Sequence, residues 1–342
     1  MPSPSLRQLA QQLGLSHTTV SEALRGSARV KPVTRAKVLK VAKALGYKRN
    51  PLAGALMSEM RRSRAGTFRG VLAVLDFDGT VGRPAGAARY HSELSKGATR
   101  RAEELGFKTD NFVTGKGGLS LERLDTILQS RGISGIFLLP VRETPDLTRL
   151  DWTHFSGIYS DYVIERPGLH SICPDHYRAM LTALERLRAM GYRRPGLVLG
   201  EAHDHRLLHR WEAAYHAYQT HHDGMTRLPP LIMNEFSEGD FVRWFRSVKC
   251  DVVMAHSAEV FDWMKAAGAK VPETHGFCCL NIMNSTEPCA GLDLQPRMLG
   301  ARGMELLIGQ VLRNECGAPE MPMATTVLAE WRDGPTLATR KG

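Results

Sequence analysis

The segment LRQLAQQLGLSHTTVSEAL, residues 6–24, has the apolar spacing of two short helices joined by a tight turn. Gly14 takes a positive φ at little cost, and Ser16 is a favourable N-cap for the second helix. The two helical faces consist of Leu6, Leu9, Ala10 and Leu13, and of Val20, Ala23 and Leu24. This is the helix-turn-helix pattern, whose second helix places its N-terminal residues in the major groove of DNA.

A third helix is expected to follow, because Pro32 suits a first helical turn and Gly46 suits a stop. Its predicted apolar stripe consists of Val33, Ala36, Val38, Leu39, Ala42 and Leu45. We therefore expect an all-α head over residues 1–49.

The distribution of charge supports a nucleic-acid partner for this head. The chain has a formal net charge of +10. Up to Arg64 it carries 13 Lys and Arg residues against 2 acidic residues, whereas the remainder carries 32 basic and 33 acidic residues. The excess positive charge therefore lies in the first fifth of the chain, as in a phosphate-binding head attached to a near-neutral body.

About 60 residues of the N-terminal segment resemble the DNA-binding head and hinge of the LacI/GalR (lactose repressor) family. The matching residues are Leu9-Ala10, Gly14-Leu15-Ser16, Thr19-Val20-Ser21, Ala23-Leu24, Thr34-Arg35, Val38, Leu45-Gly46-Tyr47, Asn50, Ala53 and Leu56. The resemblance implies a hinge helix and linker over residues 50–67. That segment is too short and too charged to be a stable helix alone, so we expect it to order on dimerisation and on DNA.

The same resemblance implies which residues contact DNA. The residues at base edges would be His17, Thr18 and Glu22, with Leu56 as a wedge in a minor-groove step. The residues at the DNA backbone would be Ser16, Thr19, Ser21, Arg25, Arg29, Asn50 and Ala53. Two alternatives stay open: His17 as an exposed side chain that reaches no base, and Leu56 as packing between two hinge helices.

Glu22 departs from the family pattern, in which most members carry Arg at this position. A carboxylate only accepts hydrogen bonds, and cytosine N4 is the matching donor in the major groove. Glu22 therefore either selects a cytosine or stays outside the interface while Arg25 compensates.

From Arg69 onward, short apolar runs alternate with helical patterns, one of which covers residues 204–222. Continuous apolar strands of this kind are typical of parallel sheets covered on both faces, which predicts a doubly wound α/β fold. The body resembles the two-subdomain, periplasmic-binding-protein-like effector domain of the same family. We assign effector binding and dimerisation to residues 68–335, with subdomains of about 68–161 plus 293–320 and 162–292 plus 321–335.

The effector site is expected between these subdomains. Asp76 and Asp78 follow the first strand of the body and are candidate hydrogen-bond acceptors for hydroxyl or amine groups, unless they form a solvated turn. By the resemblance, the family's ligand-clamping Arg falls at Trp211, with Arg210 beside it, and a family Asp falls at Asn281. Trp211 could instead be a core aromatic residue.

Metals, cofactors and membranes are not expected. The six cysteines have no metal-ligand spacing, and only His203-x-His205 has a chelating pattern. The N-terminal residues lack the apolar core of a signal peptide and no apolar run is long enough to span a bilayer, which favours a cytoplasmic protein.

Together, these features predict a sequence-specific DNA-binding transcriptional regulator rather than an enzyme. We expect a repressor that binds a pseudo-palindromic double-stranded DNA operator as a homodimer, with tetramers left open, and responds to a small, sugar-like effector. One alternative is a haloacid-dehalogenase-like phosphatase that uses Asp76 and Asp78 of the DFDGT segment. The later acidic pair that such enzymes use to hold Mg²⁺ is missing, because Asp-Asp does not occur and Trp244 is the fourth residue after Gly239-Asp240. A second alternative is a DNA-binding protein without an effector.

Overall fold

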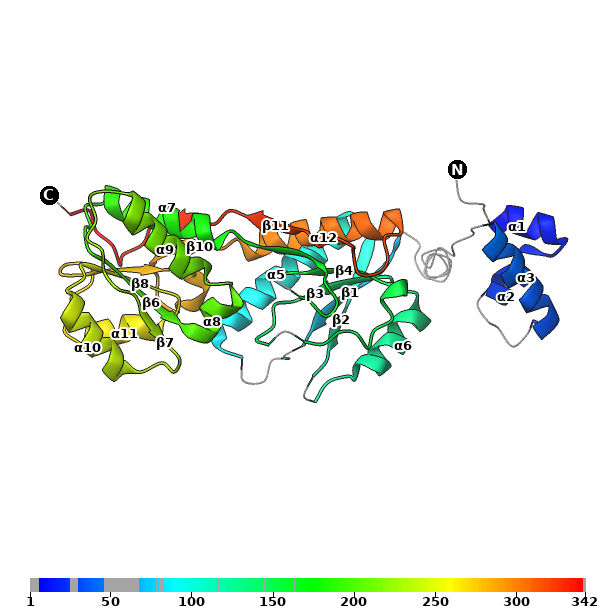
Figure 1. Cartoon of the computed structure of the whole chain (residues 1–342), viewed down its shortest axis with the longest axis horizontal. Helices are drawn as coiled ribbons and strands as arrows, with labels where there is room; N and C mark the ends of the chain where they lie inside the picture. The colour runs from blue at the N-terminus through cyan, green and yellow to red at the C-terminus, as the bar shows by residue number, and fades with distance from the viewer. Residues whose placement is uncertain are drawn as a thin grey trace.

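The computed structural model of the chain describes residues 6–24, 30–45, 68–77, 79, 83–115, 117–143, 145–162 and 164–340. Figure 1 shows the helices and strands of these segments in chain order. Among the described residues, no helix is both long and apolar enough to cross a membrane.

The head consists of three helices around a small core of its own. These helices are α1 (Leu6–Leu13), α2 (His17–Leu24) and α3 (Pro32–Ala44). The core consists of Leu9, Ala10, Leu13, Val20, Ala23, Val30, Val38 and Ala42. The predicted stripe of α3 is wrong in part, since Val33 is 82 % and Leu39 is 49 % exposed. Only one narrow face of α3 meets the two short helices, and Val38 and Ala42 fill it.

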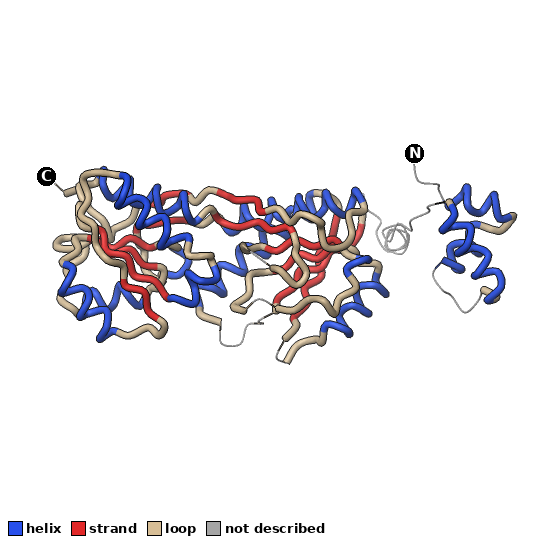
Figure 2. Tube along the Cα trace, viewed as in Figure 1, coloured by secondary structure: helices blue, strands red, loops and turns tan. Residues whose placement is uncertain are grey.

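The body has two α/β lobes, which are the two clusters of strands in Figure 2. The first lobe has a fully parallel sheet in the order β11-β5-β4-β3-β1-β2. Its strands are β1 (Gly70–Asp76), β2 (Phe107–Val113), β3 (Gly135–Leu138), β4 (Ser156–Tyr159), β5 (His170–Pro174) and β11 (Ala324–Val327). Its helices are α5 (Ala85–Glu104), α6 (Leu121–Arg131), the 3₁₀ turn η1 (Trp152–His154) and α12 (Pro296–Arg313).

The second lobe has the sheet order β12-β10-β9-β8-β6-β7, in which only β12 is antiparallel to its neighbour. Its strands are β6 (Pro195–Gly200), β7 (Leu231–Met233), β8 (Val252–Ala255), β9 (Gly276–Cys279), β10 (Ala290–Asp293) and β12 (Glu330–Arg332). Its helices are α7 (His176–Ala189), α8 (Glu201–Arg206), α9 (Arg210–His221), α10 (Glu238–Val248), α11 (Glu259–Ala266) and the 3₁₀ turn η2 (Ile282–Asn284).

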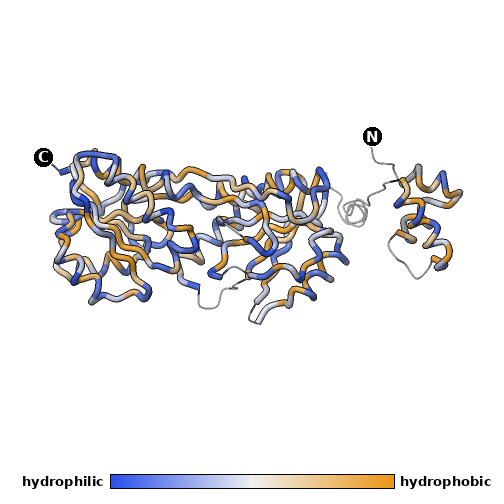
Figure 3. The backbone as a smooth tube through the Cα atoms, viewed as in Figure 1, coloured by the Kyte–Doolittle hydropathy of each residue, from blue (hydrophilic) through white to orange (hydrophobic). Residues whose placement is uncertain are grey.

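The central strands of both sheets are buried along their length, and Figure 3 shows them as largely hydrophobic. Such strands follow from short apolar runs with helices on both faces. The head and the doubly wound, two-lobed α/β body therefore confirm the predicted fold class.

The polypeptide crosses between the lobes three times, after β5, after β10 and after β11. The expected boundaries placed residues 162–292 and 321–335 in the second subdomain. They need a correction, because β5 and β11 belong to the sheet of the first lobe. Ser171 in β5 is paired with Ala324 in β11, so residues 170–174 and 324–327 lie with the first lobe. Three of the four residues of β11 are exposed and two of them are threonines, so the strand lacks the apolar run that marks a buried strand.

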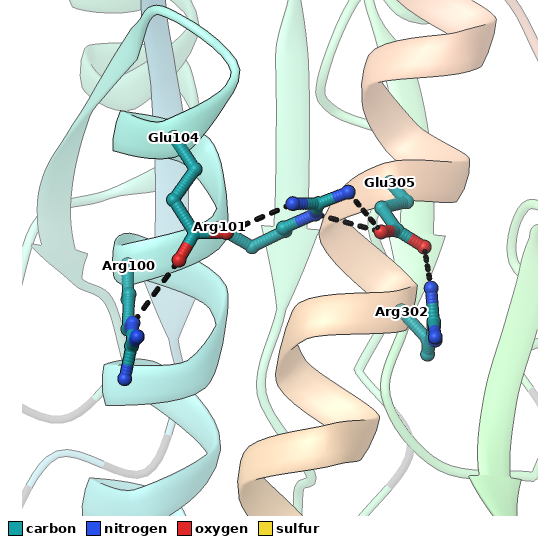
Figure 4. Close-up of polar contacts among 5 residues, drawn as sticks. All are labelled: Arg100, Arg101, Glu104, Arg302 and Glu305. Carbon is teal, nitrogen blue, oxygen red and sulfur yellow. Dashed lines mark hydrogen bonds and ion pairs between the residues drawn. The ribbon is translucent and has the colours of Figure 1, made fainter.

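In the first lobe, α5 and α12 lie side by side (Figure 1) with their backbones in close contact. A Cβ atom on Gly97 would lie 2.1 Å from the carbonyl oxygen of Arg297, and one on Gly300 would lie 2.0 Å from that of Leu94. Farther along, Arg101 on α5 pairs with Glu305 on α12 at 2.6 Å, as Figure 4 shows. Close backbone packing at the two glycines and the ion pair thus stabilise the contact between the two helices.

The helix expected over residues 204–222 is broken. α8 ends at Arg206 and α9 begins at Arg210, with Leu208 and His209 both in the left-handed region at φ 57° and 54°. The break is stabilised by Asp204, whose carbonyl oxygen accepts from His209 N at 2.8 Å.

Candidate functional site

The helix-turn-helix geometry follows from the contacts at its turn. Gly14 has φ +63°, and Leu15 N donates to the carbonyl oxygen of Ala10 at 3.1 Å, which turns the chain sharply after α1. Ser16 then caps α2, since its Oγ accepts from Thr19 N at 3.1 Å and contacts Thr19 Oγ1 at 2.7 Å. The pattern in the sequence therefore predicted both the turn and the cap.

The expected DNA contacts are placed only in part. Ser16 is exposed just before α2, and Thr19 and Glu22 are half-buried on it. The backbones of His17, Thr18 and Ser21 belong to α2, but their side chains lie outside the described residues. The remaining predicted contacts also lie outside the described residues: Arg25, Arg29, Asn50, Ala53 and Leu56.

In the body, polar side chains gather where the two lobes meet. From the first lobe, Asp161 forms an ion pair with Arg206 of α8 in the second lobe. Arg89 of α5 donates from Nε to the carbonyl oxygen of Met283 at 2.9 Å and from Nη2 to that of Ser285 at 3.1 Å. These bonds hold the lobes together in the arrangement of this structure.

We call this group the interlobe cluster. It consists of Asp76, Arg83, Arg89, Tyr90, His91, Asp161, Tyr162, His176, His203, Arg206, Arg210, His256 and Asn284.

Tyr162 organises one side of the interlobe cluster. Its hydroxyl donates to the carbonyl oxygen of Pro174 at 2.5 Å and lies 2.8 Å from His176 Nδ1. The guanidinium of Arg210 lies over the Tyr162 ring, with its Cζ 4.4 Å from the ring centroid. Burial, and then the charges of neighbouring groups, hold the pKa of His176 well below its ordinary value. His176 is therefore neutral at physiological pH.

On another side, His203 and His256 lie ring against ring, with centroids 3.9 Å apart. Asn284 Nδ2 donates to the carbonyl oxygen of His256 at 2.8 Å. Burial lowers the pKa of His203 to about 4, and burial also lowers that of His256, so both rings are uncharged at neutral pH. Burial together with the charge of Arg83 lowers the pKa of His91 to about 4.

Four buried nitrogens of the interlobe cluster and its border have no hydrogen-bond partner within the described part of the chain. These are His91 Nδ1, His203 Nε2, Arg210 Nε and Trp211 Nε1. A buried polar atom without a partner costs about 1–3 kcal/mol. A water or another polar molecule bound there would supply the missing partners.

The effector residues expected from the sequence are brought into this region only in part. Asp76 is held by Arg83 in a two-pronged ion pair with distances of 2.6 and 3.0 Å, and Arg210 joins the interlobe cluster. Trp211 is fully buried in the second-lobe core, as the alternative interpretation proposed, so its ring offers no open face for stacking. Asn281 is buried and caps η2 through a bond from Met283 N at 3.2 Å. Asp78 lies outside the described residues.

Most residues of the interlobe cluster were missed from the sequence. Tyr162 and His176 flank β5, a strand that the sequence did not predict, while Arg206 and His256 follow β6 and β8 closely. Of these residues, only His256 lies directly after the carboxyl end of a parallel strand, which is a signal that the sequence could have offered. A separate hollow of about 780 Å³, lined by β7 and α10, includes none of the expected residues.

The described chain thus combines a helix-turn-helix head with two α/β lobes joined by three crossings, which is the architecture of a periplasmic-binding-protein-like body. Residues 5–50 match the family described as "Bacterial regulatory proteins, lacI family". The head of the chain is therefore similar to the DNA-binding domain of that family.

Similarity to individual proteins is moderate. The chain is 27 % identical over 202 residues to the transcriptional regulator CelR of Thermobifida fusca and 29 % identical over 201 residues to reg1 of Streptomyces lividans. These matches cover 58 % and 57 % of this chain and 56 % and 53 % of the two proteins, so the chain spans about half the length of the curated relatives it matches.

Two solved structures share the fold over nearly the whole length. The CelR–cellobiose complex has a TM-score of 0.56 at 20 % identity and covers 97 % of this chain and 99 % of that one. The lac repressor dimer bound to operator and an anti-inducer has a TM-score of 0.55 at 15 % identity, covering 98 % and 100 %. In the body, Arg83 pairs with both carboxylate oxygens of Asp76, which argues against Asp76 as the nucleophile of a phosphatase.

Proposed function

We propose that this protein is a cytoplasmic transcriptional repressor that binds a pseudo-palindromic operator as a homodimer. The observation that carries the proposal is the helix-turn-helix head, which matches the LacI family and carries the excess positive charge of the chain. Two copies of such a head read two half-sites, and the spacing of the half-sites reflects the geometry of the dimer. Repression requires only that the bound protein blocks polymerase.

We further propose that a small, sugar-like effector binds at the interlobe cluster. Its unpartnered nitrogens suit a ligand rich in hydroxyl groups. A solved relative is in complex with cellobiose, which supports a saccharide as the first class to test.

The first lobe offers a mechanical link between this site and the head. Near its N-terminus, α5 contacts the second lobe through Arg89. Two residues past its C-terminal end, the carbonyl oxygen of Gly106 accepts from Arg69 N at 2.7 Å, where the chain enters the body. A helix of 20 residues spans about 30 Å. Because α5 is locked to α12, a change at the lobe contact would move both helices together. The effector acts only if it binds one lobe arrangement more tightly than the other.

In vitro selection from random DNA with the full-length protein tests the DNA-binding proposal. We expect enrichment of one two-fold symmetric sequence, and binding that weakens steeply with salt because Lys and Arg displace counterions from phosphates. Binding without enrichment of any sequence would contradict it. Randomising the base pair that faces Glu22 decides the two alternatives for this residue: a cytosine preference places it at a base edge, and a flat profile places it outside the interface.

Fluorescence anisotropy on the selected operator, with a panel of mono- and disaccharides, tests the effector. We expect at least one sugar to change operator affinity by tenfold or more. Arg210→Gln should weaken that response, while Arg178→Gln, an exposed arginine on α7, should leave it unchanged. If no metabolite alters affinity, the protein is a DNA-binding repressor without an effector.

A further inference from the structure

The break between α8 and α9 brings together three side chains that suit a metal ion. They are Asp204 on α8, His209 in the turn and Glu212 on α9. His209 Nδ1 lies 3.8 Å from Asp204 Oδ2 and 3.6 Å from Glu212 Oε2, and all three ligand atoms lie within 4.8 Å of one another. The sequence predicted no metal site, and its one chelating pattern, His203-x-His205, is not part of this group, because the His203 ring lies against that of His256.

The backbone holds this arrangement in an unusual conformation. Leu208 and His209 are both left-handed although neither is glycine, and such residues concentrate at functional sites. Asp204 stabilises the turn through both its backbone carbonyl and its side-chain carboxylate. Its carbonyl oxygen accepts from His209 N at 2.8 Å, and its Oδ1 accepts from Trp211 N at 3.2 Å. These bonds therefore hold the backbone that carries the three side chains without a bound ion.

The buried carboxylate of Asp204 is a separate indication of a bound cation. Its side chain is 1 % exposed, and Oδ2 has no hydrogen-bond partner in the described residues. Buried carboxylates are found paired with a cation or coordinating a metal. His209 and Glu212 are 51 % and 29 % exposed, which leaves a route from solvent to the buried oxygen.

We propose that Asp204 Oδ2, His209 Nδ1 and Glu212 Oε2 bind a first-row divalent cation, with Zn²⁺ as the ion to test. Tetrahedral Zn²⁺ holds its ligands at about 2.0–2.1 Å, which places ligand atoms about 3.4 Å apart. The two separations from His209 Nδ1, 3.8 and 3.6 Å, need to close only slightly, and the two carboxylate oxygens lie within 4.8 Å of each other. An imidazole with only two carboxylates suits Zn²⁺ better than Ca²⁺ or Mg²⁺, which prefer more oxygen ligands.

His216 completes the site as a positioning residue. Its Nε2 lies 3.7 Å from Glu212 Oε1, one helical turn along α9. Partners of this kind orient a metal-binding carboxylate. The fourth position on the metal is left to water.

A metal at this place would also stiffen one side of the interlobe cluster. α8 carries His203 and Arg206, and α9 begins with Arg210, so the turn between them positions all three. This consequence rests on the proposed effector function, but metal binding itself does not.

Metal binding is tested on the full-length protein after treatment with EDTA and dialysis. Zn²⁺ is titrated in competition with a chromogenic chelator, and Co²⁺ is added to a second sample for its visible absorption spectrum. We expect one equivalent of Zn²⁺ per chain and the intense visible bands of tetrahedral Co²⁺, without the near-ultraviolet band of cysteine thiolate coordination. A thiolate band would place the metal on cysteines and overturn the proposal.

Three variants make the test specific. His209→Asn retains a residue that tolerates the left-handed backbone, and Glu212→Gln retains the shape of the side chain. Each should weaken Zn²⁺ affinity at least tenfold while leaving the metal-free melting temperature unchanged. His221→Asn, at an exposed histidine at the end of α9, should bind as the parent does. Unchanged affinity in His209→Asn, or no stoichiometric binding in the parent, would overturn the proposal, and neither outcome depends on DNA or sugar binding.

Discussion

At the scale of single residues, burial decides what each charged or polar side chain does. The Arg83–Asp76 pair is almost completely buried, with side-chain exposures of 5 % and 15 %, whereas Arg100 in its pair with Glu104 is 83 % exposed (Figure 4). The first pair fixes an aspartate that the sequence offered as a nucleophile. The second lies in water and contributes little.

Arg83→Met should therefore destabilise the body. It leaves the buried Asp76 carboxylate without its main partner, which costs about 3–5 kcal/mol in such pairs. Urea unfolding followed by circular dichroism measures the change. The same substitution at Arg100 is the control and should leave the free energy of unfolding unchanged. Equal effects of the two substitutions would show that burial does not set the strength of these pairs.

The buried histidines should make stability depend on pH. The pKa of His203 falls from 6.5 to about 4 on folding, so the unfolded chain binds more protons between these pH values. The neutral His203 ring therefore makes its full contribution to the free energy of unfolding above pH 6.5. As the pH falls toward 4, that contribution decreases by roughly 3 kcal/mol. His176 and His256 act in the same direction. The raised pKa of Asp204, caused by burial, opposes them.

Urea unfolding at pH 7.5 and pH 5.0 measures this dependence. The protein should be less stable at the lower pH, and His203→Gln should reduce the difference. His221→Gln, which changes an exposed histidine, should not. Equal stability of the parent at both pH values, together with no effect of His203→Gln, would mean that these rings are not neutral and buried as described.

At the scale of elements, the pairing of α5 with α12 depends on two glycines. Gly97 and Gly300 let the helix backbones touch, and no side chain fits at either position. Ion pairs between Glu93 and Arg297 and between Arg101 and Glu305 lie along the same contact. The pair therefore behaves as one rigid unit within the first lobe.

Gly97→Ala and Gly300→Ala should each destabilise the first lobe by about 1–3 kcal/mol, because overpacking outweighs the gain in helix propensity. Gly309→Ala in α12 is the matched control. An added Cβ there would meet only the flexible end of Arg313 at 3.1 Å, so this variant should keep or raise stability. Thermal unfolding of the three variants gives the comparison, and a loss at Gly309 as large as at Gly300 would contradict it.

At the scale of the whole molecule, the arrangement of the two lobes depends on a narrow contact between α5 and η2. A Cβ on Gly86 would lie 2.6 Å from the Cα of Asn284, so only glycine fits in the lobe arrangement of this structure. The bonds from Arg89 to the carbonyl oxygens of Met283 and Ser285 lie beside it. Asn284 also belongs to the interlobe cluster, where we propose that the effector binds.

Gly86→Val should hold the lobes apart. Its radius of gyration from small-angle X-ray scattering should exceed that of the parent, and its operator affinity should no longer respond to effector. Ala88→Val, at an exposed position of the same helix, should match the parent in both measurements. A Gly86→Val protein with parental dimensions would show that the contact does not set the lobe arrangement.

The sequence alone determined the features that depend on neighbours along the chain. Helical spacing around Gly14 and Ser16 predicted the turn and cap of the head, because those contacts join residues within one or two helical turns. Apolar runs likewise predicted the buried central strands. Strands that pair through polar or exposed residues, such as β11 and β12, gave no such signal.

Only the tertiary structure decided where the chain's polar groups meet. The ion pair of Asp161 with Arg206 joins residues from different lobes, and no local pattern links them. The left-handed turn at Leu208 and His209 brings Asp204 and Glu212 close together. It contains no glycine, so the sequence offered no signal for a left-handed backbone there. Local spacing fixes helices and strands through short-range bonds, whereas sites form from long-range contacts whose free energy depends on burial that only the folded chain creates.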